Sequence, residues 1–168
     1  MKIVLVGYMY CGKTTVGKRI ANILNFEFKD TDTLVENVCG ENISSIFETK
    51  GEEFFRQKER EVLVQLLQED NIVIATGGGL PCYEDNMHLI KNNCKSIYLK
   101  LTPQQILSRA LLSKKKRPLI ENIPIEKRLE FIKNSLQERE KFYQQADVFI
   151  GALSISRFEL EMTLEYLK

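Results

Sequence analysis

The feature that most constrains the fold of this 168-residue chain is the segment GYMYCGKT at residues 7–14, which matches the phosphate-binding pattern G-x-x-x-x-G-K-[ST]. It follows an apolar run at residues 3–6, typical of a buried strand, and leads into Lys13–Leu24, where apolar residues recur at helical spacing. In such a strand, turn and helix arrangement, backbone N–H groups and the helix dipole attract phosphate oxygens. Lys13 would reach the β- and γ-phosphates and the Thr14 hydroxyl would ligate Mg²⁺, so the sequence predicts a nucleoside triphosphate site.

The composition predicts one globular domain that spans residues 1–168. Its 24 basic and 23 acidic residues give a net charge of +1, which implies no general affinity for nucleic acid. The four cysteines form no C-x-x-C pair, which argues against a zinc knuckle or a disulfide framework and fits a reducing cytosol. The apolar opening is too short for a signal segment or a membrane span. We therefore expect a cytoplasmic protein that binds neither nucleic acid nor membrane. We also expect a monomer, although none of these features determines the oligomeric state.

Short strand-like runs alternate with helical segments along the chain, which is typical of an α/β domain with a mostly parallel sheet. Thr102 and Pro103 suit the N-cap and first position of a helix. Because ligands bind at the carboxyl ends of the strands in such sheets, the residues after each strand are the first candidates for a site. The expected strands cover residues 3–6, 26–29, 72–75, 96–101 and 148–150, and the expected helices cover 13–24, 33–38, 43–50, 52–69, 84–92, 103–112, 124–145 and 157–167.

Two aspartates, Asp30 and Asp32, follow the second expected strand. Asp30 is well placed to hold Mg²⁺ directly or through water, and Asp32 could face a substrate hydroxyl and take its proton. Ordinary turn chemistry is the alternative, since aspartate caps helices and Asp32 could cap the helix that begins at Thr33. The sequence alone leaves both interpretations open.

Three consecutive glycines, Gly77, Gly78 and Gly79, follow the third expected strand. Such a run is costly in conformational entropy, so it indicates a place where another group approaches the backbone closely. A flexible turn is the alternative, but the carboxyl end of a strand favours a wall that contacts a ligand. No aspartate closes this strand, so Asp30 is the candidate Mg²⁺-binding acid.

Two arginines occur at or beside the apolar stripes of expected helices: Arg56 follows two phenylalanines, and Arg139 falls on the stripe of residues 124–145. An inward arginine needs a partner, which can be a structural carboxylate or that of a ligand, because its planar fork binds a carboxylate bidentately. The alternative is a buried stem with a solvated head. A further basic run, KKKR at residues 114–117, lies between two helices and is either a solvated loop or a lid that closes over the nucleotide.

Six segments of the chain, in order, resemble the markers of the shikimate kinase family, and the resemblance covers nearly the whole chain. The family pattern has a P-loop that ends G-K-[ST]-T, a D-T-D after the second strand, and an F-R after a G-x-x-x-F turn. A T/S-G-G-G turn, an R-P-L lid and an R-x-x-x-Y segment follow. Each marker alone is weak, but six in register are specific. Here they read GKTT (12–15), DTD (30–32), GEEFFR (51–56), TGGG (76–79), RPL (117–119) and REKFY (139–143).

The resemblance implies a P-loop fold of three α/β/α layers around a five-stranded parallel sheet, like that of nucleoside monophosphate kinases, with a mobile lid at about 112–124. It also implies an ATP- and Mg²⁺-dependent enzyme that phosphorylates the 3-hydroxyl of shikimate. The products would be shikimate 3-phosphate and ADP, in the shikimate pathway to chorismate and aromatic amino acids.

The same resemblance implies a role for each site residue. Lys13, Asp32 and Arg117 would be catalytic, with Asp32 orienting or deprotonating the hydroxyl and Arg117 closing from the lid onto ATP. Thr14 and Asp30 would hold Mg²⁺. ATP would be bound by Tyr10, Cys11, Gly12, Lys13, Thr14, Thr15 and Arg117, and shikimate by Asp32, Arg56, Gly77, Gly78, Gly79 and Arg139, the two arginines gripping its carboxylate.

The sequence departs from the family pattern at Tyr10, where glycine is usual and where a side chain reduces backbone freedom. Three other interpretations remain. A kinase of the same fold for another small molecule, such as gluconate, would explain the P-loop and the lid but not Arg56, Arg139 and the three glycines together. A GTPase switch commonly carries N-K-x-D, which this chain lacks. A non-catalytic relative is disfavoured because every expected polar residue is present.

Overall fold

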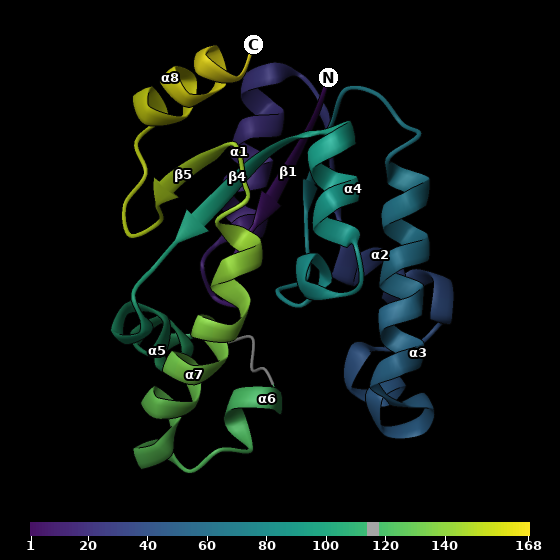
Figure 1. Ribbon diagram of the computed structural model, residues 1–168, viewed down its shortest axis with the longest axis vertical. Coiled ribbons are helices and arrows are strands. Elements are labelled where there is room, and N and C mark those ends of the chain that lie inside the picture. The colour runs from purple at the N-terminus through teal and green to yellow at the C-terminus, as the bar shows by residue number, and fades with distance from the viewer. Residues whose placement is uncertain (114–117) are drawn as a thin grey trace.

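The computed structural model describes residues 1–113 and 118–168. Arg117 and the rest of the basic run at residues 114–117 therefore lie outside the described residues. Five parallel strands form one sheet, which confirms the expected five-stranded parallel sheet, and their order is β2-β3-β1-β4-β5 (Figure 1). The strands are β1 (Lys2–Val6), β2 (Glu27–Asp30), β3 (Ile72–Ala75), β4 (Lys95–Lys100) and β5 (Val148–Gly151).

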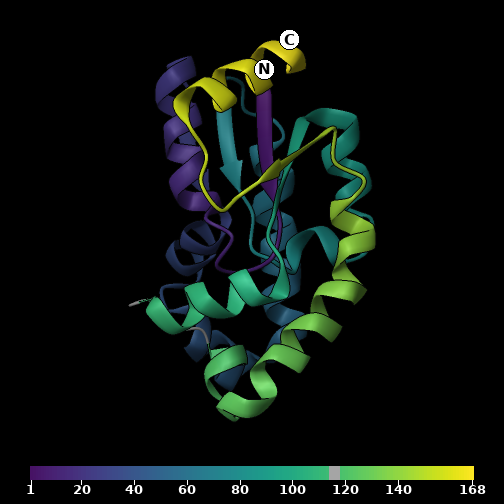
Figure 2. The ribbon, with the colours of Figure 1, turned by 90° about the vertical axis from the view of Figure 1, so that its left-hand side faces the viewer.

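Helices cover both faces of this sheet and give three layers, α/β/α. Figure 2 shows α1 on one side of the sheet and α7 on the other. The helices are α1 (Lys13–Leu24), α2 (Thr31–Cys39), α3 (Ile43–Leu66), α4 (Asn86–Asn93), α5 (Pro103–Leu112), α6 (Pro118–Glu121), α7 (Ile125–Tyr143) and α8 (Arg157–Leu167), with a short 3₁₀ turn η1 (Leu80–Cys82).

The central strands are apolar along their whole length because both of their faces are covered by helices. All four residues of β3 are buried, and β1 is buried from Ile3 to Val6. Within the ladder, Val4 pairs with Ile74 of β3 on one side and with Ser96 of β4 on the other. The edge strand β2 is only partly buried, as its polar sequence EFKD predicts. The core therefore forms around β1 and β3 and fixes where their carboxyl ends meet.

The helix that follows β4 begins as predicted at Thr102 and Pro103. Thr102 Oγ1 accepts a hydrogen bond from the Gln105 backbone N–H at 3.3 Å, and Gln105 Oε1 accepts one from the Thr102 N–H at 2.9 Å. This reciprocal capping box satisfies two backbone donors that the first turn of a helix would otherwise leave unpaired. The local sequence thus determines where α5 starts.

The segments expected as two helices, 43–50 and 52–69, form the single element α3 with an interruption at Gly51. Gly51 has φ 83° and ψ 169°, a conformation that is essentially restricted to glycine. The helix expected from residue 84 begins instead at Asn86, because Glu84 adopts a positive φ of 46°. Neither η1 nor α6 was predicted, since each is too short to show a hydrophobic period.

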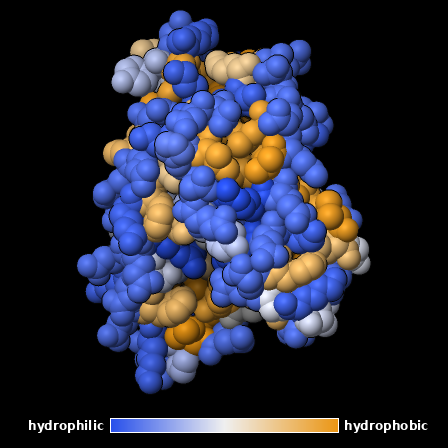
Figure 3. Space-filling view, turned by 45° about the vertical axis from the view of Figure 1, so that its right-hand side comes forward, coloured by the Kyte–Doolittle hydropathy of each residue, from blue (hydrophilic) through white to orange (hydrophobic). Residues whose placement is uncertain are grey.

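The surface in Figure 3 is mainly hydrophilic, with apolar patches that are separated from one another. Across the described ranges 1–113 and 118–168, no helix combines the length and the apolar character needed to cross a membrane. The main apolar mass of the described chain is the interior cluster around the sheet.

Candidate active site

A cavity of about 800 Å³ opens at the carboxyl ends of the strands, where the sequence predicted a site. It brings together segments that are far apart in the chain: the P-loop, both aspartates after β2, the glycine turn after β3, and arginines from α3 and α7. Among the residues expected to form the site, the cavity is lined by Tyr10, Gly12, Lys13, Thr14, Thr15, Asp30, Asp32, Arg56, Gly77, Gly78, Gly79 and Arg139.

Backbone carbonyls of the P-loop bind the Lys13 ammonium. The Lys13 ammonium is buried and donates to the carbonyls of Gly7 and Tyr8 at 2.7 and 2.9 Å. Cys11, which was expected to contact ATP, is buried, and its Sγ lies 3.6 Å from Lys13 Nζ. Thr15, in contrast, is exposed in the cavity wall. The loop thus keeps a positive charge next to the N-terminus of α1, where a phosphate is bound most favourably.

Tyr10 adopts a left-handed backbone conformation, with φ 65°. This is the position at which glycine is usual in the family that the sequence resembles. A side chain makes this region of φ and ψ unfavourable, and glycine enters it at little cost. Tyr10 therefore adopts this conformation at an energetic cost, and its side chain packs against the core cluster.

Asp30 connects the P-loop to the start of α2. Its Oδ2 accepts a hydrogen bond from the Thr14 hydroxyl at 2.8 Å, and its Oδ1 accepts from the backbone N–H groups of Asp32 and Thr33 at 3.1 and 3.5 Å. The N-cap is therefore Asp30, and the interpretation of Asp32 as the cap is wrong. A hydroxyl and a carboxylate side by side in the cavity are hard oxygen donors, which suit Mg²⁺.

Asp32 lies one residue inside α2 and is buried, with 8% of its surface exposed. A Cβ built on Gly77 would lie 2.8 Å from Asp32 Oδ1 and closer still to Glu59 Oε1, so both carboxylates converge on this glycine. Gly77 itself donates its N–H to the Thr31 hydroxyl at 2.9 Å. None of the three consecutive glycines has a positive φ, so this turn needs glycine for space and not for backbone freedom.

Glu59 is a site residue that the sequence reasoning missed. Its side chain is 1% exposed, and one carboxylate oxygen, Oε2, accepts from Arg56 Nη1, while Oε1 has no hydrogen-bond partner among the described residues. Burial raises the pKa of Glu59 to about 7, although the nearby Arg56 guanidinium opposes the rise. The sequence feature that could have identified Glu59 is its spacing, since it lies three residues after Arg56 on the same helix.

The buried carboxyl of Glu59 predicts a pH dependence of stability. Its pKa is about 7 in the folded protein against an ordinary value of 4.5, so the folded state holds this proton more tightly than the unfolded chain does. The contribution of Glu59 to the free energy of unfolding should therefore fall as pH rises from 4.5 to about 7, by roughly 3 kcal/mol at most. Chemical denaturation at both pH values checks this. Glu59→Gln should remove this fall in the free energy of unfolding. Glu61→Gln, which changes an exposed carboxyl of the same helix, should keep it. An equal fall in all three proteins would contradict the assignment.

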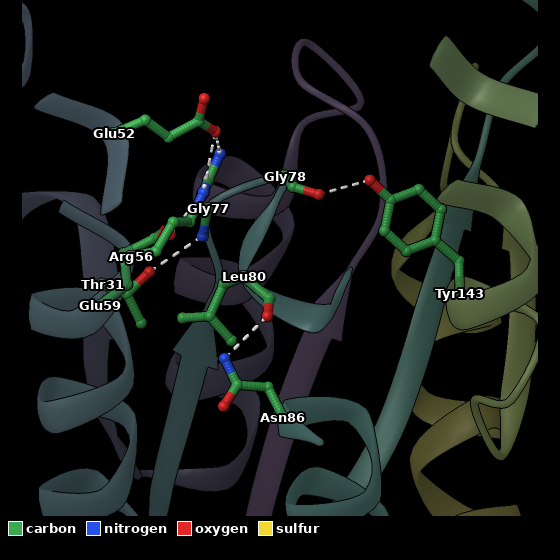
Figure 4. Close-up of polar contacts among 9 residues, drawn as sticks. All are labelled: Thr31, Glu52, Arg56, Glu59, Gly77, Gly78, Leu80, Asn86 and Tyr143. Atoms are coloured by element: carbon green, nitrogen blue, oxygen red, sulfur yellow. Dashed lines mark hydrogen bonds and ion pairs between the residues drawn. The ribbon is translucent and has the colours of Figure 1, made fainter. Parts of the chain in front are cut away.

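Arg56 and Arg139 reach the cavity from two different helices. Arg56 is 11% exposed, pairs with Glu59, and uses Nε and Nη2 to contact Glu52 Oε1 at 3.3 and 3.1 Å (Figure 4). The Arg139 guanidinium lies 5.4 Å from the centre of the Tyr8 ring, a cation–π distance. Of the two alternatives that the sequence left open, the structure favours the inward one, because both arginines line the cavity. The structural carboxylates of Arg56 are Glu52 and Glu59.

Arg109 is a second residue of the cavity wall that the sequence reasoning missed. Its Nη1 donates to the carbonyls of Tyr10 and Cys11 at 3.3 and 3.0 Å, and its Nη2 donates to those of Ala152 and Leu153. One guanidinium therefore ties the P-loop to the segment after β5. The sequence feature that could have identified Arg109 is its spacing from Ile106, which lies three residues earlier on a short amphipathic helix.

Comparison with known proteins agrees with this geometry. The sequence matches the family model for shikimate kinase over residues 9–161. The chain belongs to the shikimate kinase family. It is 41% identical over 168 residues to the shikimate kinase of Caldanaerobacter subterraneus subsp. tengcongensis, covering 99% of this chain and 96% of that protein. It is 34% identical over 169 residues to that of Bacteroides thetaiotaomicron, covering 100% and 97%.

Solved shikimate kinases share the whole fold. The crystal structure from Bacteroides thetaiotaomicron superposes with a TM-score of 0.89 at 34% identity, covering 99% of this chain and 96% of that one. The enzyme from Acinetobacter baumannii, solved in complex with shikimate, gives 0.84 at 32% identity, covering 99% and 90%. A gluconokinase from Sinorhizobium meliloti gives only 0.61 at 12% identity, so its likeness shows the fold alone.

Proposed function

We propose that this member of the shikimate kinase family transfers the terminal phosphoryl group of ATP to the 3-hydroxyl of shikimate, which gives shikimate 3-phosphate and ADP. The observation that carries the proposal is the composition of one cavity: a P-loop lysine at one end, two inward arginines at the other, and a buried carboxylate between them. A phosphate-binding loop would bind ATP, and paired arginines would bind an acid. The carboxylate would accept the proton of the hydroxyl that reacts.

The nucleotide end of the cavity is the P-loop, residues 10–15. Its backbone N–H groups would bind the phosphates, and the Lys13 ammonium would turn from the carbonyls of Gly7 and Tyr8 to the phosphoryl group that is transferred. Thr14 and Asp30, whose side chains already touch, would hold Mg²⁺. When bound, the ion would neutralise charge on the phosphate oxygens.

The acid end would bind shikimate with Arg56 and Arg139 on its carboxylate and the glycine turn against its ring. Asp32 would accept the proton of the 3-hydroxyl as its oxygen forms a bond to the terminal phosphorus and the bond to ADP breaks. The burial of Asp32 and its place beside Gly77 support this role. We propose that Arg117, outside the described residues, closes from a lid at about 112–124 and stabilises the transferring group.

The proposal also covers location, partners and oligomeric state. The net charge of +1 and the lack of a C-x-x-C pair support a cytoplasmic protein with no nucleic-acid partner. We propose that the protein works as a monomer without a membrane partner, because one chain supplies every group of the cavity described above.

A coupled assay for ADP release tests the proposed function. The protein is incubated with ATP and Mg²⁺ and with shikimate, gluconate or a nucleoside monophosphate as acceptor. ADP release should depend on shikimate and on Mg²⁺, and the other acceptors should give only the background rate. Phosphorylation of gluconate at a comparable rate, or no release with shikimate, would contradict the proposal.

Gly79 gives a test of the acid end. A Cβ at this position would lie 2.5–2.6 Å from three atoms of the Arg56 guanidinium, so Gly79→Ala must displace that group. We expect the KM for shikimate to rise by about tenfold or more, with little change in the KM for ATP. Gly151→Ala is the control, since a Cβ there meets nothing within 4 Å. An unchanged KM for shikimate in Gly79→Ala would show that the position of Arg56 does not matter for binding.

A further inference from the structure

Tyr143 is a buried tyrosine whose hydroxyl is bonded to the glycine turn. It is the last residue of α7, has no exposed surface, and donates a hydrogen bond to the Gly78 carbonyl (Figure 4). Burial raises the pKa of Tyr143 well above its ordinary value of 10, so the hydroxyl keeps its proton at neutral pH. A protonated hydroxyl can act as a donor to a carbonyl, which a phenolate cannot.

Two other side chains hold the turn on either side of this bond. The Thr31 hydroxyl accepts from the Gly77 N–H at 2.9 Å, and Asn86 Nδ2 donates to the Leu80 carbonyl at 2.9 Å (Figure 4). Both contacts are buried. The peptide group between Gly78 and Gly79 lies between these two points, and Tyr143 is the side chain that bonds to it.

The geometry of the peptide bond determines what the Tyr143 contact does. In a planar trans peptide the carbonyl and the following N–H point in opposite directions. A hydroxyl that holds the Gly78 carbonyl on one side therefore directs the Gly79 N–H to the other side, which is the side where Figure 4 shows Arg56. The Arg56 guanidinium packs directly against Gly79, and the Gly79 N–H donates to no group among the described residues.

We propose that Tyr143 is a positioning residue for recognition of the acid: by holding the Gly78 carbonyl it directs the Gly79 N–H toward the carboxylate that Arg56 binds. The inference rests on the proposed function, because it names shikimate as the acid. It also explains why Tyr143 and Arg139 share a helix, since one turn of α7 separates the arginine from the residue that orients the opposing backbone donor.

Tyr98 provides a matched control within the same cluster. Its ring centre lies 5.3 Å from that of Tyr143 and it is 1% exposed. Its hydroxyl is buried and has no hydrogen-bond partner among the residues that the structure describes. Tyr98→Phe and Tyr143→Phe therefore remove the same atom from neighbouring buried rings, but only the second removes a bond to the glycine turn.

Steady-state kinetics of the two variants with shikimate and with its methyl ester test the proposal. In Tyr143→Phe we expect the KM for shikimate to rise by roughly tenfold, with kcat and the KM for ATP changed less than about twofold. The preference for shikimate over the uncharged ester should shrink by a similar factor, and Tyr98→Phe should leave all of these values unchanged. Equal losses for shikimate and the ester, or an unchanged KM for shikimate, would overturn the inference.

A measurement on the unaltered protein covers the case in which Tyr143→Phe does not fold. In ¹⁵N-labelled protein the Gly79 amide signal should shift when shikimate is added and stay in place when the methyl ester is added. A Gly79 amide that ignores shikimate would overturn the inference while leaving the proposed function intact. A protein that neither binds nor phosphorylates shikimate would instead contradict the proposed function.

Discussion

Replacement of Lys13 by methionine should lower turnover by about 10³-fold or more, with an unchanged circular dichroism spectrum. Methionine keeps an unbranched chain of similar length but removes the ammonium that lies inside the P-loop. Phosphoryl transfer depends mainly on positioning and charge neutralisation, so this loss acts on the transition state. The measurement is kcat in the ADP-release assay with both substrates saturating.

Lys18→Met is the control for this change. Lys18 lies on the same helix, is exposed and does not line the cavity, so its replacement should leave kcat unchanged. If Lys13→Met turns over at a near-normal rate, the P-loop lysine has no part in the reaction and the nucleotide end of the proposed site is wrong.

Replacement of Arg56 by alanine should weaken shikimate binding by roughly 30-fold or more, because the carboxylate of bound shikimate loses one of its two charge partners. ATP affinity should change far less, since Arg56 lies at the acid end of the cavity. Isothermal titration calorimetry with each ligand separates the two effects. Lys58→Ala, on the same helix but outside the cavity, is the control. Normal shikimate binding by Arg56→Ala would refute the assignment of Arg56 to the carboxylate.

Glu59 makes the Arg56 experiment sharper. Arg56→Ala removes the guanidinium that opposes the rise of the Glu59 pKa, so the buried Glu59 carboxyl should be neutral at pH 7 in this variant. In the double variant Arg56→Ala/Glu59→Gln one neutral group replaces another. Shikimate affinity should therefore equal that of Arg56→Ala, because the loss comes from the missing guanidinium. Recovery of affinity in the double variant would mean that a charged Glu59 repels the ligand when Arg56 is absent.

The sequence predicted the fold well because the P-loop and the strand pattern are local signals. The limits of α1 and α5 agree with the predicted ones, and the strands agree to within one residue or so. Asp30, Arg56 and Arg139 were identified because they follow a strand or fall at or beside an apolar stripe. These properties depend on near neighbours in the chain, so one sequence is enough to show them.

Glu59 and Arg109 were missed because their roles depend on distant partners. The raised pKa of Glu59 comes from burial against Asp32 and the glycine turn, which only the folded chain brings together. Arg109 contacts carbonyls that lie more than 90 residues before it and more than 40 after it. The capping role considered for Asp32 belongs to Asp30, two residues earlier. Turn chemistry predicts that an aspartate caps the helix, but it does not predict the exact position of the cap.

The interruption of α3 at Gly51 divides the wall of the cavity into two segments that side chains still connect. Before Gly51, Ile43 and Phe47 shape the wall; after it, Arg56 carries the charge that we propose binds the acid. The Phe47 ring centre lies 4.8 Å from that of Phe55, and the Arg56 guanidinium lies 5.2 Å from the Phe55 ring centre. A substitution at Phe47 that admits bulkier acids should therefore also move Arg56 through Phe55, so an engineer would have to redesign size selectivity and charge selectivity together.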